Sequence, residues 1–112
     1  MKIIKSDKIL NSLSWFFDLA GITLWPLIII RPGAKETTIN HESIHIKQQG
    51  ELLVLPFYVL YLLEYIIRSI AYLNIDKAYE NISFEREAYS NQDNPDYLIS
   101  RKRYSWVKYL FN

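Results

Sequence analysis

The chain contains two histidines, His41 and His45, and a glutamate, Glu42, directly follows the first. Residues four apart on an α-helix share a face, so both imidazoles can reach one metal ion. Glu42 is turned roughly 100° from His41, so its carboxylate can instead take a proton from a metal-bound water. The spacing predicts a zinc site with His41 and His45 as ligands and Glu42 as general base. The alternative is a helix face on which two histidines only make hydrogen bonds.

A catalytic zinc site commonly has three protein ligands. The chain has neither a third histidine nor a cysteine, so the third ligand is expected to be a carboxylate. Glu51 is too near the motif to fold back onto it, and the candidates in order of preference are Glu85, Glu87 and Glu64. Glu85 is preferred because Ala88 shares its helix face and allows another helix to approach. The alternative is that Glu85 and Glu87 belong to a solvated charged turn.

The motif is expected on a helix that follows a strand. Residues 22–30 are β-branched and apolar and end at a turn over 31–33, which predicts a strand. Pro26 cannot donate to a ladder, which places that strand at a sheet edge. The helix that carries the motif should run towards Gly50, with an N-cap at Thr37, Thr38 or Asn40. Gln48 and Gln49 are expected on its surface, without a role.

The rest of the chain is expected to be mainly helical. Residues 2–17 predict a short helix or helix-like arm, and 51–73 a long apolar helix with Pro56 in its first turn. Residues 77–90 predict a third helix, with Asn81 or Ser83 as its cap. A turn over 91–96 then leads into a last helix, which is basic and aromatic.

The apolar segment 51–73 allows three interpretations. Residues 52–63 are too few to span a bilayer, and the extension to Leu73 brings in Glu64 and Arg68. We favour a buried central helix of a globular domain over a helix on or in a membrane and over an oligomer interface. Side chains that would suit a membrane surface are Trp15, Phe16, Phe17, Trp25, Trp106, Tyr109 and Phe111, and the basic Arg101, Lys102, Arg103 and Lys108.

The composition narrows the class of protein. The 112 residues are half hydrophobic with a net charge of +1, which predicts one folded domain over 1–112, neither disordered nor a nucleic-acid binder. The absence of cysteine excludes disulfides and thiolate metal sites. Asp7 and Asp18 interrupt a resemblance to a signal peptide at the N-terminus. A cytoplasmic location is expected, with membrane association as the alternative.

HESIH, together with the downstream segment F-E-R-E-A, resembles the gluzincin group of zinc metallopeptidases. In that group a glutamate from a later helix, often written E-x-x-A, is the third zinc ligand. The resemblance implies zinc ligands at His41, His45 and Glu85, with Ala88 completing the E-x-x-A pattern and Glu42 as general base. Tyr89 stands where the group usually has Asp or Asn, so support for a ligand histidine is not expected from this position. The TLWP strand, H-x-K-Q-Q and the apolar helix also look like a family of short bacterial proteins with this layout.

These observations predict a small, mainly helical α+β domain of zincin-like architecture, with one edge strand or hairpin before the HExxH helix. The expected activity is zinc-dependent hydrolysis of a peptide or protein substrate by activated water. The competing expectation is a non-catalytic, membrane-associated or partner-binding helical protein with a structural or vestigial zinc site. Glu42 favours catalysis, because a structural site does not need it.

Overall fold

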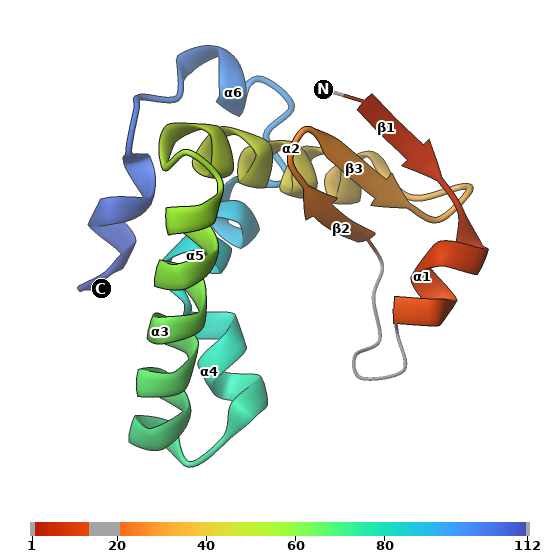
Figure 1. Cartoon of the computed structure of the whole chain (residues 1–112). Coiled ribbons are helices and arrows are strands. Elements are labelled where there is room, and N and C mark those ends of the chain that lie inside the picture. Colours follow the sequence, from red (N-terminus) through yellow and green to blue (C-terminus); the bar gives the residue numbers. More distant parts are fainter. Residues whose placement is uncertain (1, 14–20, 112) are drawn as a thin grey trace.

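A computed structural model describes residues 2–13 and 21–111 (Figure 1). It is mainly helical with one small sheet, which confirms the predicted α+β class. Trp15, Phe16 and Phe17, which we singled out as membrane-facing aromatics, lie outside the described residues.

The sheet has three strands, β1 (Lys2–Lys5), β2 (Gly21–Leu24) and β3 (Leu27–Ile30), in the order β1-β3-β2. β2 and β3 form an antiparallel hairpin, so the single strand predicted over 22–30 is wrong and the hairpin alternative holds. Pro26, which has no N–H to donate, lies in the hairpin turn. β3 lies between β1 and β2 and is the central strand, and its residues Ile28 and Ile30 are fully buried.

The N-terminal segment differs from the predicted helix over 2–17. Its first residues form β1, which pairs in parallel with β3 and aligns Ile3 with Ile28. β-branched residues favour such pairing over a helix. A helix, α1 (Asp7–Leu13), begins only after Ser6, whose hydroxyl accepts a hydrogen bond from the N–H of Ile9 at 3.2 Å.

Two long helices follow the hairpin, α2 (Glu36–Glu51) and α3 (Leu55–Tyr72). α2 carries the motif as predicted, but it begins at Glu36 after Lys35, without a side-chain cap. Thr37, Thr38 and Asn40 lie inside the helix, so the predicted caps are wrong. Pro56 occupies the first turn of α3, as predicted.

The helix predicted over 77–90 is two helices, α4 (Ile75–Asn81) and α5 (Ser83–Asn91). The break is at Ile82, which is extended and fully buried. The caps predicted at Asn81 and Ser83 are also wrong: Asn74 caps α4, and Glu64 accepts hydrogen bonds from both the N–H and the hydroxyl of Ser83 at 2.6 Å. α5 is therefore capped by a side chain from α3.

The C-terminal tail contains a short helix, α6 (Tyr97–Ser100), and a 3₁₀ helix, η1 (Ser105–Tyr109), where one helix was predicted. Trp106 of η1 packs on Phe84 of α5, with ring centroids 4.6 Å apart. This contact and the buried Ile82 and Phe57 form the core at the α3–α5 end of the molecule.

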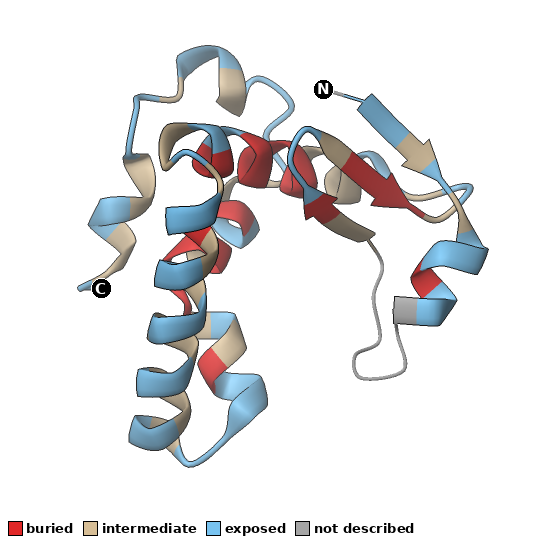
Figure 2. Cartoon of the chain, viewed as in Figure 1, coloured by how far each residue is buried: buried red, intermediate tan, exposed pale blue. Residues whose placement is uncertain are grey.

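The buried residues lie mainly on α2, α5 and the hairpin (Figure 2). α3 has one buried residue, Phe57, and its outer face is exposed. The favoured prediction of a buried central helix is therefore wrong, because hydropathy alone does not say whether an apolar face is covered.

Candidate metal centre

His41 and His45 lie one turn apart on α2, and Glu85 reaches them from the first turn of α5. The Nε2 atoms of the two histidines are 3.1 Å apart, and each lies 3.0 Å from Oε1 of Glu85. All three side chains are buried. The structure therefore brings together the three residues predicted as ligands, and the carboxylate beside the histidines is Glu85, the preferred candidate. That these residues bind a metal stays a prediction.

The triangle of these three atoms can be compared with the size of a metal ion. Ligand atoms bound tetrahedrally to zinc at 2.0–2.1 Å lie about 3.3 Å from one another. The observed separations of 3.0–3.1 Å are a few tenths of an ångström smaller. His41, His45 and Glu85 thus need only a small outward adjustment to hold zinc.

Gln48 determines which nitrogen of His45 faces the triangle. The amide nitrogen of Gln48 donates to the carbonyl of Phe84 at 3.0 Å and to Glu87 at 2.9 Å. Its oxygen must then accept from Nδ1 of His45, at 2.7 Å. In a neutral imidazole this leaves Nε2 with a lone pair, which is the form that binds a metal.

His41 is held in the same way by a residue from beyond α5. Its Nδ1 lies 2.8 Å from Oε1 of Gln92, and the ring of Tyr89 packs edge-on against it, with centroids 4.5 Å apart. Position 89 is a tyrosine, which contacts His41 through its ring and not through a carboxylate. Gln92, three residues later, supplies that hydrogen bond, and outer partners of this kind fix the ring orientation of a metal ligand.

Glu85 is the acidic member of this cluster. Burial acts to raise its pKa, but the two histidines outweigh burial and hold the pKa well below its usual range. Burial acts to lower the pKa of His45, and Glu85 raises it to about 9. Tyr61 of α3 donates to Oε2 of Glu85 at 2.6 Å. Burial and the charge of Glu85 raise the pKa of Tyr61, so it stays a donor.

Glu42 lies beside the edge strand β2. The hydroxyl of Thr23 donates to Oε2 of Glu42 at 2.6 Å, which orients the carboxylate. A Cβ at Gly21 of the same strand would lie 3.2 Å from the carbonyl oxygen of Ile29 but 3.5 Å from Cγ of Glu42, so glycine is required by the packing on β3 and not by Glu42. Glu42 is therefore held in a defined position and remains separate from the three converging ligand atoms.

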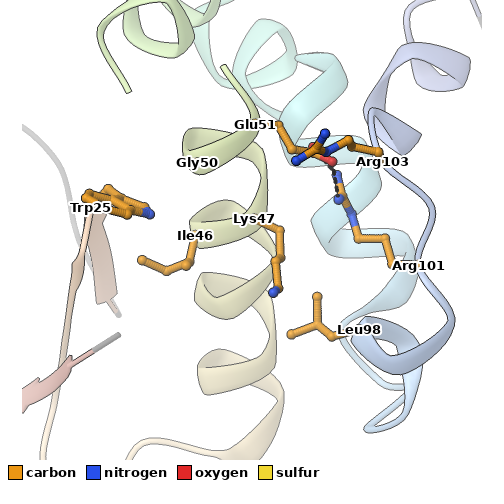
Figure 3. Close-up of a pocket in the computed structure, with 8 residues that line it drawn as sticks. All are labelled: Trp25, Ile46, Lys47, Gly50, Glu51, Leu98, Arg101 and Arg103. Carbon is orange, nitrogen blue, oxygen red and sulfur yellow. Dashed lines mark hydrogen bonds and ion pairs between the residues drawn. The ribbon is translucent and has the colours of Figure 1, made fainter. Parts of the chain in front are cut away.

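The other carboxylates considered as ligands have different partners. Glu87 is fully buried and accepts from Nε of Arg101 at 2.5 Å. Glu51 accepts two hydrogen bonds from Arg101 at 3.0 Å (Figure 3). Glu64 pairs with Arg68 at 2.8 Å in addition to capping α5. The side chain of Arg101, which was suggested for a membrane surface, is only 4% exposed and is held in these ion pairs, so that suggestion is wrong for Arg101.

The expectation that Gln48 and Gln49 lie on the surface is also wrong. Both are buried, and Gln49 bonds the backbone of the hairpin through Trp25 N and Thr23 O. Residues of the site that the sequence analysis missed are Thr23, Gln48, Tyr61 and Gln92. The position of Gln48 three residues after His45 was a local signal, whereas the other three contacts join segments far apart in the chain.

A pocket of about 790 Å³ opens onto the site and is lined by His41, Glu42, His45 and Glu85. Its other wall is aromatic and comes from α3, α4 and α5, with side chains Phe57, Tyr58, Tyr61, Tyr65, Tyr79 and Tyr89. A metal centre that faces a pocket is typical of a catalytic site, because a structural site is closed on all sides.

Comparison with known proteins gives no match, whether to a protein-family model, to a curated protein or to a solved structure.

Proposed function

We propose that this protein is a zinc-dependent hydrolase of peptide bonds, with His41, His45 and Glu85 as metal ligands and Glu42 as general base. The observation that carries the proposal is the convergence of three ligand atoms beside a pocket, with Nδ1 of both histidines bound to amide oxygens. Hydrogen-bonded histidines without a metal would not require Nε2 of both rings to face one carboxylate oxygen.

The chemistry follows from these residues. Zinc, when bound, supplies a Lewis acid and lowers the pKa of a water molecule. Glu42 would be the residue that accepts a proton from that water and passes it to the leaving amine. Thr23 keeps the Glu42 carboxylate oriented. The hydroxyls of Tyr58 and Tyr61 already donate to Thr23 and Glu85, so a donor to the substrate carbonyl would have to come from another tyrosine of the aromatic wall. Tyr79 and Tyr89 both line this wall.

The substrate would be held mainly by its side chains. β2 is an edge strand and borders the site, yet the carbonyl of Thr23 already accepts from Gln49 and from Tyr58, both at 3.1 Å. An added peptide strand would have to displace these donors. The aromatic wall instead offers apolar surface, so we expect peptides with an aromatic or large aliphatic side chain near the cleaved bond.

Zinc content and hydrolysis test the proposal together. Bound zinc per chain is measured by elemental mass spectrometry, and cleavage of a mixed peptide library by mass spectrometry of the products. Wild type should bind one zinc per chain, His41→Ala and Glu85→Ala should lose it, and Glu42→Gln should keep zinc and lose cleavage. Glu36→Gln, an exposed glutamate on the same helix, is the matched control and should behave as wild type.

The outcomes separate the alternatives. A chain that binds no zinc refutes the metal site. Zinc that depends on His41 and Glu85, in a protein that cleaves no peptide, favours the non-catalytic alternative. Cleavage that survives Glu42→Gln removes Glu42 from the reaction.

A further inference from the structure

The outer face of α3 is an exposed apolar surface. All ten exposed residues of this helix are leucine, isoleucine, valine, alanine or proline, and they recur at 55/56, 59/60, 62/63, 66/67 and 70/71. The exposed band runs the whole length of the helix (Figure 2). It continues past both ends at Leu53 and Leu73, which are 80% and 89% exposed. Monomeric soluble proteins rarely expose an apolar stripe of this extent.

The two charged residues of α3 lie on the opposite, inner face. Glu64 and Arg68 form an ion pair, Glu64 caps α5, and Arg68 donates to the carbonyl of Leu110 at 3.0 Å. A surface helix of a protein in water places its charges outside and its apolar residues inside. α3 has the reverse distribution, which indicates that its outer face meets an apolar medium.

The composition of the outer face favours hydrocarbon over another protein. Protein interfaces carry about one hydrogen bond per 100–200 Å², and no exposed side chain of α3 has a donor or acceptor. By length and hydropathy α3 also satisfies the requirements of a bilayer helix. The exposed Lys47 lies one turn before Glu51 on α2, and the exposed Arg103 lies beside Glu51 at the end of that helix, just before α3 begins (Figure 3). Lys102, next to Arg103 in the chain, is also exposed, and Tyr104 N donates to Glu51 at 2.8 Å. Their charge complements anionic headgroups.

The neighbouring helix decides how α3 would meet the bilayer. α4 runs beside α3 (Figure 1) and exposes Asp76, Lys77 and Glu80. A spanning α3 would carry these charges into the hydrocarbon, which is costly. We propose that α3 lies in the plane of an anionic bilayer, with its outer face in the acyl boundary and α4 and α5 on the water side. This proposal is independent of the metal centre.

Vesicle flotation of the full chain tests the proposal. Wild type should float with vesicles of phosphatidylcholine and phosphatidylserine, and less with phosphatidylcholine alone. The double substitution Leu63→Glu/Ile67→Glu should lower the bound fraction roughly tenfold. Ile99→Glu is the matched control, because Ile99 is 85% exposed but belongs to α6, and it should float as wild type. Circular dichroism and thermal unfolding verify that each variant is folded.

Depth measurements distinguish the in-plane arrangement from a spanning one. The chain has no cysteine, so single cysteines at Val59, Ile66 and Ile70 can carry a polarity-sensitive dye. Lipids with a shallow quencher should quench all three equally, and a dye at residue 99 should not respond. Unequal depths along the helix would overturn the in-plane arrangement, and binding indifferent to phosphatidylserine would overturn the role of the basic residues. A wild type that ignores vesicles but forms a dimer that Leu63→Glu/Ile67→Glu dissociates would assign the face to a second copy of the chain.

Discussion

Gln48→Leu should weaken zinc binding much more than a neighbouring substitution of equal burial. Gln48 accepts from Nδ1 of His45 at 2.7 Å, and leucine removes that acceptor while keeping a similar volume. Loss of such an outer partner typically costs 10–100-fold in metal affinity, which corresponds to about 1.4–2.7 kcal/mol. The ring of His45 can then adopt the tautomer that places a proton on Nε2, and that proton competes with the metal.

Gln49→Leu is the control for this prediction. Gln49 is equally buried on the same helix, but its amide bonds Trp25 N and Thr23 O of the hairpin. Gln48→Leu removes three hydrogen bonds and Gln49→Leu removes two. Each hydrogen bond contributes about 1 kcal/mol of net stability. Both variants should therefore unfold at lower denaturant concentration, by about 2–3 kcal/mol, while only Gln48→Leu should lose zinc affinity.

The assay is competition for zinc with a chromophoric chelator at a fixed pH, on protein shown by circular dichroism to be folded. Equal loss of affinity in the two variants would mean that general loosening of α2 is responsible. An unchanged affinity in Gln48→Leu would mean that Gln48 does not support His45 as a ligand. Either result would refute the reasoning from the hydrogen bond.

Three further predictions concern stability. Arg101→Ala should destabilise the protein by about 3–5 kcal/mol in urea unfolding, because it leaves the fully buried Glu87 charged and without its cation; a loss below 1 kcal/mol would contradict this. Burial acts to raise the pKa of Glu87, but hydrogen bonds from Arg101, Gln48 and Tyr97 lower it below its ordinary value of 4.5. The stability that the Glu87 carboxylate contributes is therefore present above pH 4.5 and is lost as the pH falls through the pKa of the folded state. In urea unfolding from neutral pH to pH 3, the free energy of unfolding should fall more steeply for wild type than for Glu87→Gln. Removal of zinc by a chelator should lower the melting temperature, since a ligand at a thousand times its Kd stabilises by about 4 kcal/mol; identical melting curves would argue against a bound metal.

The structure confirms the predicted helix that carries the motif and places Glu85 beside it, and both expectations came from local spacing. The four-residue spacing of His41 and His45 and the helix that carries them are properties of one short segment. Glu85 was preferred over Glu87 because Ala88 shares its face, and the fold separates the two glutamates as that spacing requires, with Glu85 at the histidines and Glu87 at Arg101. Neighbouring helix positions differ by about 100°, so two residues of one short helix can serve different clusters.

The features that were missed depend on contacts between distant segments. The parallel pairing of β1 with β3 joins residues that are 25 positions apart, and the support of His41 by Gln92 joins residues 51 apart. Glu64 could be recognised as a polar residue within an apolar segment, but its role as the cap of α5 depends on where the chain breaks at Ile82. The residue pattern within one segment does not predict which distant segment it will contact.

The two faces of α3 connect the candidate site with the proposed membrane surface. The inner face places Phe57, Tyr58, Tyr61 and Tyr65 in the wall of the pocket, and Tyr61 bonds the proposed ligand Glu85 directly. The outer face of the same helix is the apolar surface. A bilayer that orders α3 would therefore also hold Tyr61 and the aromatic wall in place. If both proposals hold, vesicles should increase the rate of peptide cleavage by wild type and not by Leu63→Glu/Ile67→Glu, whose zinc content should be unchanged. Stimulation of both proteins to the same extent would separate the site from the outer face of α3.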